Sequence, residues 1–344
     1  MTAARLWVTP DDLGLLTDLY ELSMLQAYWT AGMHREATFS LYFRKLPPSR
    51  RFMLACGQQH AACLVTELRY PRPALDRLSR LGEFRQEFLR WLEDFRFTGD
   101  IVAVPEGTPV FPQEPLLEVT GPIAEAQLLE TLIMNLVHLE TVLASKAARM
   151  VLAAAGRPVL DFGMRRMHGL DAAVHGVRAY RTAGIAGTSH VLAGLHFDLS
   201  VRGTMAHSYI QAFEDEAAAF RSYAKLYPGT TLLVDTYDTI QAVEKVIAMH
   251  RELGDAFRVG AIRLDSGDMA ELAKAARPRL DEAGMTDVRI FASGGLDEHE
   301  IACLVASGAP IDAYGVGTSL GTSDDAPSLD LVYKLTSYAG TPRL

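Results

Sequence analysis

The sequence has little cysteine and no long apolar run. Its 344 residues include three cysteines, Cys56, Cys63 and Cys303, an odd number whose spacing matches no zinc-binding pattern. We therefore expect reduced core thiols, with the first two on one helix face. No stretch reaches the roughly 18 uncharged apolar residues of a membrane span, and the N-terminus has no run typical of a signal peptide. These absences predict a cytoplasmic protein with no membrane partner.

Basic residues are in deficit. The chain carries 33 lysines and arginines against 42 aspartates and glutamates, a formal net charge of −9. Because a nucleic-acid backbone is bound by a positive field, this balance speaks against a DNA or RNA partner. Small anions stay possible ligands, since salt screens charges beyond about 10 Å and a few local arginines then suffice.

Common catalytic motifs are also missing. The sequence has no GxxxxGK(S/T), HExxH, GxSxG or CxxC pattern, which leaves P-loop, zincin, α/β-hydrolase and thiol-redox mechanisms without support. Electrostatic catalysis on a phosphorylated substrate remains. The many carboxylates leave room for Mg²⁺, which prefers one or two carboxylates together with substrate phosphates.

The first 122 residues mix two kinds of pattern. Apolar periodicity predicts helices over 13–29, 56–68 and 81–95, whereas alternation and turn residues predict strands over 37–43 and within 101–119. This mixture indicates an α+β domain, residues 1–122. Leucines at helical spacing then predict a long, mostly buried helix over 124–155, at the start of a second domain, residues 123–344.

A different rhythm begins at residue 159. Short apolar runs end in polar or glycine clusters at 159–163, 201–204, 231–235, 261–265, 289–293 and 312–317. The last five start roughly 30 residues apart or less, the length of one strand plus one helix. Helical patterns at 269–280 and 298–307 fill gaps between them. The repeat indicates a parallel α/β arrangement, with a closed or nearly closed barrel favoured and a doubly wound open sheet as the alternative.

The ends of these runs gather the polar residues. They read DFGMRR from Asp161, RGTMAH from Arg202, VDTYD from Val234, RLDSGD from Arg263, ASGGL from Ala292 and GVGTSLG from Gly315. In a barrel, all six clusters face one cleft. The two glycine-rich ends present backbone amides suited to phosphate, and Arg165, Arg166 and Arg263 add forked donors. We therefore predict an anionic, phosphorylated substrate.

Each feature also has a simpler interpretation. A glycine pair after a strand is most often a turn, and GVGTSLG misses the GxGxxG spacing of dinucleotide-binding loops. Aspartates after a strand commonly cap the next helix, which applies to Asp235, Asp238, Asp265 and Asp268. A lone His207 is more often structural than catalytic. The recurrence of all six clusters at one structural position favours the functional interpretation.

Seven blocks, in order, carry a family resemblance. They are LLTDLYELSM from Leu15, ATFSLYFRKLP from Ala37, DFGMRRMHG from Asp161, GTSHVLAG from Gly187, GTMAHS from Gly203, IRLDSGD from Ile262 and residues 313–335. The chain resembles nicotinate phosphoribosyltransferases, of the type II phosphoribosyltransferase family. The resemblance implies an N-terminal α+β open-faced sandwich domain, an irregular TIM-like α/β barrel, and a homodimer with shared active sites. It also implies NAD biosynthesis by pentosyl transfer from 5-phosphoribosyl 1-diphosphate to nicotinate, with substrate-bound Mg²⁺ and ATP hydrolysis.

The resemblance assigns roles to binding residues. Phe162 corresponds to the ring stacked on one face of the pyridine, and Tyr20 to its partner from the other subunit. Arg44 resembles a further contact from that subunit. Arg165 corresponds to the arginine that holds the product phosphate, and Arg263 to the one near the pyridine carboxyl.

It also assigns catalytic and phosphate-binding residues. Asp265 corresponds to the residue that contacts the ribose hydroxyls, Asp235 to a further active-site acid, and His207 to the histidine that the family phosphorylates with ATP. The phosphate-binding loops correspond to Ser293, Gly294 and Gly295 and to Gly315, Gly317 and Thr318.

Ser189 bears on the choice of substrate. In nicotinamide-using relatives an aspartate stands at this position and accepts from the amide. A buried carboxylate would repel a carboxylate ligand, whereas a hydroxyl donates to it. Ser189 therefore predicts an aromatic carboxylate substrate.

Three points stay open. Family members continue past the segment 334–344 into a loop whose lysines help to bind phosphates, so ATP coupling is uncertain from the sequence. A phosphoribosyltransferase for another aromatic carboxylate is an alternative, including a quinolinate type in which Arg166 and His168 hold the second carboxylate; the effect of Met167 on the pocket is also open. A non-catalytic binder of phosphoribosyl diphosphate is the other alternative.

Overall fold

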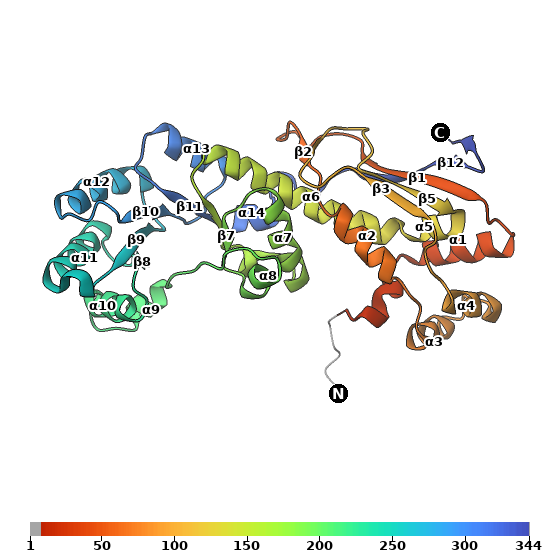
Figure 1. Ribbon diagram of the computed structural model, residues 1–344, viewed down its shortest axis with the longest axis horizontal. Helices are drawn as coiled ribbons and strands as arrows, with labels where there is room; N and C mark the ends of the chain where they lie inside the picture. Colours follow the sequence, from red (N-terminus) through yellow and green to blue (C-terminus); the bar gives the residue numbers. More distant parts are fainter. Residues whose placement is uncertain (1–7, 344) are drawn as a thin grey trace. The chain divides into compact units, whose positions relative to one another are not determined.

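The computed structural model describes residues 8–343, which form two compact units (Figure 1). The first unit is discontinuous: it consists of the chain up to Val142 and the segment from Ala326 onward. The second unit comprises Leu143–Asp325. The units thus differ from the single boundary expected after residue 122. Residues 123–142 and the C-terminal strands pack with the first unit.

A five-stranded antiparallel sheet forms the base of the first unit. Its order is β13 (Thr341–Pro342), β12 (Leu331–Tyr338), β1 (Glu36–Phe43), β5 (Leu117–Pro122) and β3 (Asp100–Ala103). A second, two-stranded sheet pairs β2 (Met53–Leu54) with β4 (Pro109–Val110). The strands expected over 37–43 and within 101–119 are thereby confirmed.

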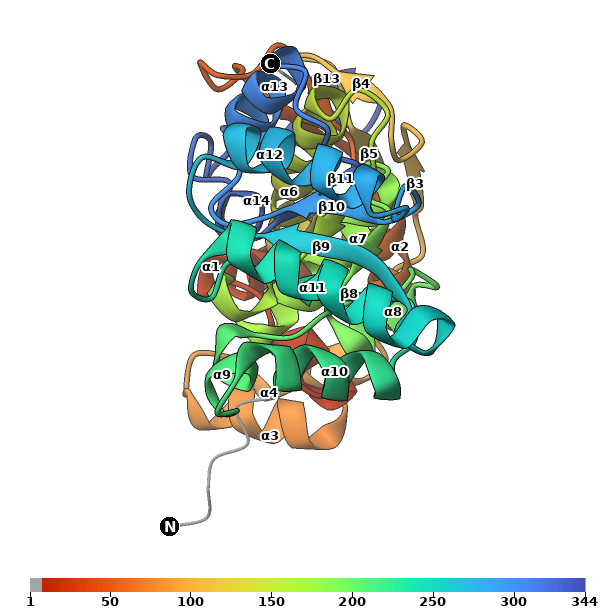
Figure 2. The same ribbon diagram turned by 90° about the vertical axis from the view of Figure 1, so that its left-hand side faces the viewer.

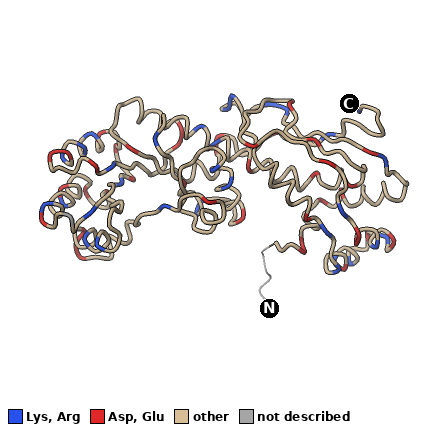
Figure 3. The backbone as a smooth tube through the Cα atoms, in the orientation of Figure 1, with Lys and Arg blue, Asp and Glu red and all other residues tan. Residues whose placement is uncertain are grey.

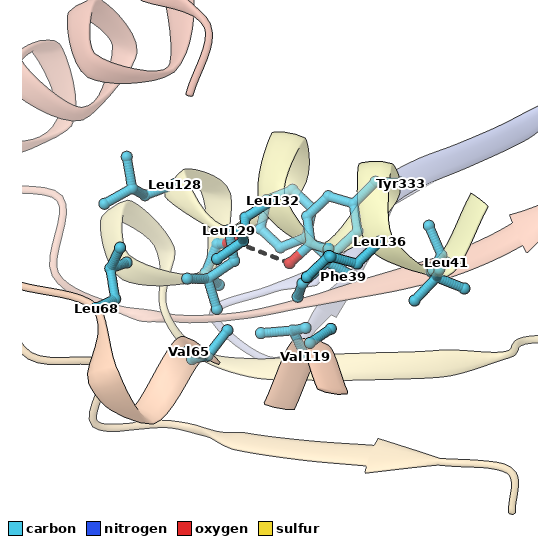
Figure 4. Close-up of a cluster of buried hydrophobic side chains, with 14 of the residues drawn as sticks. Phe39, Leu41, Val65, Leu68, Val119, Leu128, Leu129, Leu132, Leu136 and Tyr333 are labelled. Carbon is cyan, nitrogen blue, oxygen red and sulfur yellow. Dashed lines mark hydrogen bonds between the residues drawn. The ribbon is translucent and has the colours of Figure 1, made fainter. Parts of the chain in front are cut away.

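The core of this unit joins segments that are far apart in the chain. Phe39 of β1 stacks on Tyr333 of β12, with ring centroids 4.9 Å apart and planes 7° apart. The Tyr333 hydroxyl donates to the Ala126 carbonyl at 2.8 Å, and Leu132 and Leu136 lie around the two rings (Figure 4). Burial of these side chains explains why the C-terminal strand returns to the first unit.

The helices of the first unit depart from the expected bounds. They are η1 (Pro10–Leu15), α1 (Leu19–Thr30), α2 (Gln58–Glu67), α3 (Arg72–Arg80), α4 (Gln86–Glu93), α5 (Ile123–Leu128) and α6 (Glu130–Ala153), whose last residues belong to the second unit. The helix expected over 81–95 begins later, because Gly82 is left-handed at φ +75° and Arg85 is extended. The one expected over 13–29 is divided by the extended residue Asp18.

The second unit contains a six-stranded parallel sheet. Its order is β7 (Gly187–Thr188), β6 (Val159–Asp161), β11 (Ala313–Val316), β10 (Arg289–Ala292), β9 (Val259–Leu264) and β8 (Thr230–Leu233). Between the strands run η2 (Met164–Arg166), α7 (Leu170–Thr182), α8 (Val191–His196), α9 (His207–Gln211), α10 (Glu216–Leu226), α11 (Thr239–Leu253), η3 (Gly254–Ala256), α12 (Met269–Glu282), α13 (Glu298–Ala306) and α14 (Thr318–Thr322). Helices α10 to α12 cover the outer face of β8 to β10 (Figures 1 and 2).

The strand order is that of a barrel with one irregular sector. The last strand, β11, pairs with the first, β6, and successive strands lie side by side, which excludes the doubly wound alternative. The strand expected over 201–204 is wrong, because only Val201 forms a bridge, to Thr188. Thr204 instead donates its hydroxyl to the Thr231 carbonyl at 2.7 Å. This segment therefore bridges β7 and β8 without forming a regular strand.

The cysteines and the charged residues can also be compared with the expectations from the sequence. None of the three cysteines forms a disulfide bond within the described residues. Only Cys56 is buried, and it precedes α2 rather than sharing a helix face with the exposed Cys63. The expectation of three core thiols is therefore wrong for Cys63 and Cys303. Acidic and basic residues are interspersed along both units (Figure 3). Within residues 8–343, no helix has the length and apolar character needed to cross a membrane.

Candidate active site

The parallel sheet brings the predicted residues of the second unit to one edge. The carboxyl ends of β6, β7, β8, β9, β10 and β11 are followed by Phe162, Ser189, Asp235, Asp265, Ser293 and Gly317, respectively. Carboxyl ends of neighbouring parallel strands share one edge, where α/β barrels place their active sites. Five of the six predicted clusters, together with Ser189 after β7, therefore form one candidate site. His207 of the sixth cluster, which begins at Arg202, reaches this site from a segment that is not a regular strand.

Asp265 is the centre of this site. One carboxylate oxygen, Oδ1, accepts a hydrogen bond from the Ser293 hydroxyl at 2.5 Å and lies 3.9 Å from Nη2 of Arg263. The other, Oδ2, lies 3.7 Å from Nε2 of His207. The carboxylate remains partly exposed, so it is fixed by three neighbours and still open to a ligand.

Asp235 supports Asp265 from the neighbouring strand. Its Oδ2 accepts from the Asp265 backbone N–H at 3.1 Å and from the Ser266 hydroxyl at 2.5 Å. Its Oδ1 is buried and has no hydrogen-bond partner among the described residues. Asp235 therefore fixes the turn after β9 and keeps one oxygen for a ligand.

Two other aspartates do follow the simpler interpretation. Asp238 accepts from the Gln241 N–H and caps α11, and Asp268 accepts from the Glu271 N–H and caps α12. Asp235 and Asp265 make no such cap, and their bonds tie neighbouring strand ends together. Capping thus accounts for the second aspartate of each cluster and not for the first.

Arg263 is a largely buried cation with donors to spare. Its Nε has no hydrogen-bond partner among the described residues. Burial lowers the pKa of its guanidinium, nearby Arg165 lowers it further, and Asp265 and Asp235 act in the opposite direction. An anion placed here would satisfy donors that the protein leaves open. Arg165 itself is exposed on η2.

Phe162 is held by its backbone and by a second ring. Its N–H donates to the Val316 carbonyl at 2.7 Å, and its ring meets Phe291 edge-on with centroids 5.9 Å apart. Gly315 makes room for both rings, because a Cβ there would lie 2.7 Å from Phe162 and 2.8 Å from Phe291. The glycine therefore has a packing role beside the predicted phosphate contact.

Asp161 begins one of the predicted clusters, although no role of its own was predicted for it. It is 1% exposed, and its oxygens accept from the Gly163 N–H and the Thr188 hydroxyl, both at 2.7 Å. Burial raises its pKa, while these two hydrogen bonds act against that shift. Its carbonyl also accepts from the Ser189 N–H at 2.9 Å. Asp161 thus joins the turn of Phe162 to the end of β7, where half-buried Ser189 lies.

The SGG loop after β10 requires its glycines. Gly294 and Gly295 have φ of +93° and +73°, and a Cβ on Gly294 would lie 1.8 Å from the Asp265 carbonyl oxygen. The backbone of this loop therefore rests directly on the turn of Asp265. In the other predicted loop, Gly317 precedes α14 and Thr318 is exposed at its first position.

The remaining predicted residues divide between the units. His207 begins α9, with Nδ1 3.1 Å from the Thr236 hydroxyl. Tyr20 and Arg44 belong to the first unit, where Tyr20 is 46% exposed and Arg44 binds Asp330 at 2.7 Å. Their role stays a prediction. In the second unit, Arg166 and His168, invoked for quinolinate, are both exposed.

Comparisons with known proteins agree with this geometry. A model of the nicotinate phosphoribosyltransferase (NAPRTase) N-terminal domain matches residues 15–138, and one of the NAPRTase family matches residues 158–338. Nicotinate phosphoribosyltransferase of Mycobacterium tuberculosis is 54% identical over 96% of this chain and 71% of its own length. That of Bacillus subtilis is 42% identical over 95% and 67%.

Solved structures share the fold. Human nicotinic acid phosphoribosyltransferase superposes with a TM-score of 0.85 at 28% identity, over 95% of this chain and 76% of that chain. A nicotinate-nucleotide pyrophosphorylase from Pyrococcus furiosus superposes at 0.80 with 24% identity, over 99% and 80%, which indicates a common fold. With both family models matched in order along most of its length, the chain belongs to the nicotinate phosphoribosyltransferase family.

Proposed function

We propose that this protein transfers the phosphoribosyl group of 5-phosphoribosyl 1-diphosphate to nicotinate, giving nicotinate mononucleotide and diphosphate in NAD salvage. The observation that carries the proposal is the convergence of Ser293, His207 and Arg263 on the Asp265 carboxylate, at the sheet edge that also holds Phe162. The M. tuberculosis and B. subtilis relatives named above carry this activity in their names.

Nicotinate recognition requires a flat apolar surface and a cation. Phe162 offers a ring already braced by Phe291, and offset stacking on it contributes on the order of 1 kcal/mol beyond buried area. The unpaired Nε of Arg263 supplies a charged donor for the carboxylate, and Ser189 supplies a hydroxyl that does not repel it.

The transfer step depends mainly on how the two substrates are positioned. Displacement at the anomeric carbon passes through an oxocarbenium-like state, which nearby carboxylates stabilise without a covalent intermediate. Asp265 holds the ribose hydroxyls in this proposal, and Asp235 keeps Asp265 in place through its backbone N–H. Arg165 and the backbone of the SGG and GVGT loops bind phosphate groups.

Mg²⁺ fits the donors present. The unpartnered Oδ1 of Asp235 and the exposed part of Asp265 are oxygen ligands on neighbouring strands, and Mg²⁺ binds one or two carboxylates along with substrate phosphates. When bound, the ion would neutralise charge on the diphosphate group.

His207 is the proposed site of ATP-dependent phosphorylation. A phosphoryl group would add about two negative charges next to Asp265 and so change the local field on which loop order and substrate affinity depend. We further propose a homodimer in which Tyr20 and Arg44 reach the site of the other subunit, acting in the cytoplasm.

A diphosphate-release assay tests the reaction. Phosphoribosyl diphosphate and Mg²⁺ are supplied with nicotinate, nicotinamide or quinolinate, each with and without ATP. We expect turnover of nicotinate, with ATP stimulation that disappears in His207→Ala. Asp265→Asn should lower kcat/KM by about 100-fold or more, whereas Asp268→Asn, three residues along on the rim, should stay within about threefold of wild type. No diphosphate release with nicotinate, or full activity of Asp265→Asn, would refute the proposal.

A further inference from the structure

The first unit contains a cavity of about 300 Å³ that the transferase proposal does not use. It lies between α2 and the segment that leads into β3. Its lining includes Val65, Thr66, Arg69, Arg96, Phe97 and Ile101. All of these residues belong to the first unit, whereas the Asp265 cluster belongs to the second. The volume is at the lower end of the range for small-molecule sites.

A glycine contact shapes one wall of this cavity. A Cβ on Gly99 would lie 2.1 Å from the Thr120 carbonyl oxygen and 2.8 Å from the Phe97 ring. A Cβ on Gly121 would lie 3.4 Å from the same ring. Phe97 therefore packs against the bare backbone of Gly99 and Gly121, which fixes an aromatic wall. Val65 and Ile101 add apolar side chains to the lining.

Two guanidinium groups without acidic partners share this cavity. Arg69 donates to the Leu68 carbonyl at 2.6 Å and Arg96 to the Phe95 carbonyl at 2.5 Å, so each bonds only the backbone of the preceding residue. Neither forms an ion pair with a carboxylate among residues 8–343. Each guanidinium has five N–H donors, so most remain available to a ligand.

The two cations also oppose one another. The pKa of Arg69 is lowered, first by burial and then by the charge of Arg96. Like charges held together beside an apolar surface are unfavourable, and an anion between them removes the repulsion. This arrangement stands out in a chain with a net charge of −9.

We propose that the cavity binds a small aromatic carboxylate, with its ring against Phe97, Val65 and Ile101 and its carboxylate between Arg69 and Arg96. The apolar lining selects a ring over a bare inorganic anion, and the forked donors match a carboxylate. The inference does not depend on the transferase activity, because none of its residues belongs to the Asp265 cluster.

The test is calorimetric titration of the full chain with 1-naphthoate and with its neutral analogue 1-naphthalenemethanol. We expect the carboxylate to bind and the alcohol to bind at least about tenfold more weakly. Arg69→Gln and Arg96→Gln should each raise the dissociation constant about tenfold, and Thr66→Phe should block binding by adding a large side chain to the lining.

Two controls separate this cavity from the transferase site. Arg90→Gln alters an exposed arginine paired with Glu87 in the same unit and should leave the affinity unchanged. Arg263→Gln should also leave it unchanged while it impairs nicotinate turnover. Arg96 is exposed, so its variant should fold normally. No binding of 1-naphthoate at millimolar concentration, equal binding of the alcohol, or loss of binding in Arg263→Gln but not in Arg96→Gln would overturn the proposal.

Discussion

The two units place carboxylates in opposite surroundings. In the second, Asp265 lies at an open sheet edge with a hydroxyl donor, a histidine and an arginine around it. In the first, Glu21 is 0% exposed, and it accepts a hydrogen bond from the neutral amide of Gln127 at 3.0 Å. The same amide also donates to Glu130. The charge of Asp265 is thus favoured by the cations around it, whereas a charge on Glu21 is made unfavourable by burial and by a second acid that shares the Gln127 amide.

The pKa of Glu21 reflects this difference. Burial raises it to about 7, and the charge of Glu130 adds to the shift. Such a carboxyl binds its proton more tightly in the folded state than in the unfolded chain. The first unit therefore contains a group that opposes folding at neutral pH, whereas Asp265 of the second unit is partly exposed and open to a ligand.

Gly294→Ala should disturb the surroundings of Asp265 and have the largest effect of the substitutions considered. The new Cβ would lie 1.8 Å from the Asp265 carbonyl oxygen, so the SGG loop must move away from the turn that it supports. We expect a stability loss of several kcal/mol and a fall in kcat/KM of about 100-fold or more. Thermal unfolding and diphosphate release measure both.

Gly284→Ala is the matched control. Gly284 has a similar φ of +79°, but a Cβ there meets nothing within 4 Å. Only backbone strain of about 1 kcal/mol is expected, with activity unchanged. If both variants lost activity equally, positive φ rather than the contact with Asp265 would explain the requirement for glycine.

Glu21→Gln should remove the buried ionisable carboxyl of the first unit, and with it the contrast with Asp265. Because the folded pKa of about 7 exceeds the ordinary value of 4.5, the wild-type free energy of unfolding should fall as the pH rises from about 4.5 to 7 and then level off. The loss amounts to up to about 3 kcal/mol. The variant lacks this titration, so its advantage should appear at pH 8 and vanish near pH 4.5.

Urea unfolding at a series of pH values measures this effect. Glu87→Gln, which removes an exposed carboxyl of the same unit, should follow the wild-type curve. Parallel curves for wild type and Glu21→Gln between pH 4.5 and 7 would show that Glu21 is not the group responsible.

The site was more predictable from sequence than the path of the chain around it. Asp235 and Asp265 were singled out because each follows an apolar run, Arg263 lies one residue before the end of β9, and the ends of neighbouring parallel strands share an edge. Asp161 was given no role because both of its oxygens are used within the protein, a property that no sequence pattern records. The two-residue strand β7 is too short to produce a period.

Long-range pairing explains the other errors. Phe39 pairs with Leu335 across the sheet, so the C-terminal strand joins the first unit through contacts almost three hundred residues apart in the chain. Periodicity identifies a strand but not its neighbour. The division into units therefore depended on partners that local patterns do not specify.

Ser293→Ala should have the smallest effect, and it tests the comparison between the hydrogen-bond donors of Asp265 and Glu21. Ser293 donates to Asp265 at 2.5 Å, as Gln127 donates to Glu21 at 3.0 Å, so each unit has one removable donor to its carboxylate. A hydrogen bond to a charged group contributes about 1.5–3 kcal/mol, so we expect kcat/KM to fall at least about tenfold with little change in stability. Gln127→Leu should lower stability and leave the substrate KM values unchanged.

A double-mutant cycle gives the decisive measurement, because Ser293→Ala should have almost no further effect once Asp265→Asn has removed the charge. Additive losses would mean that Ser293 acts on the substrate directly, and that Asp265 is held by Asp235, His207 and Arg263 without it.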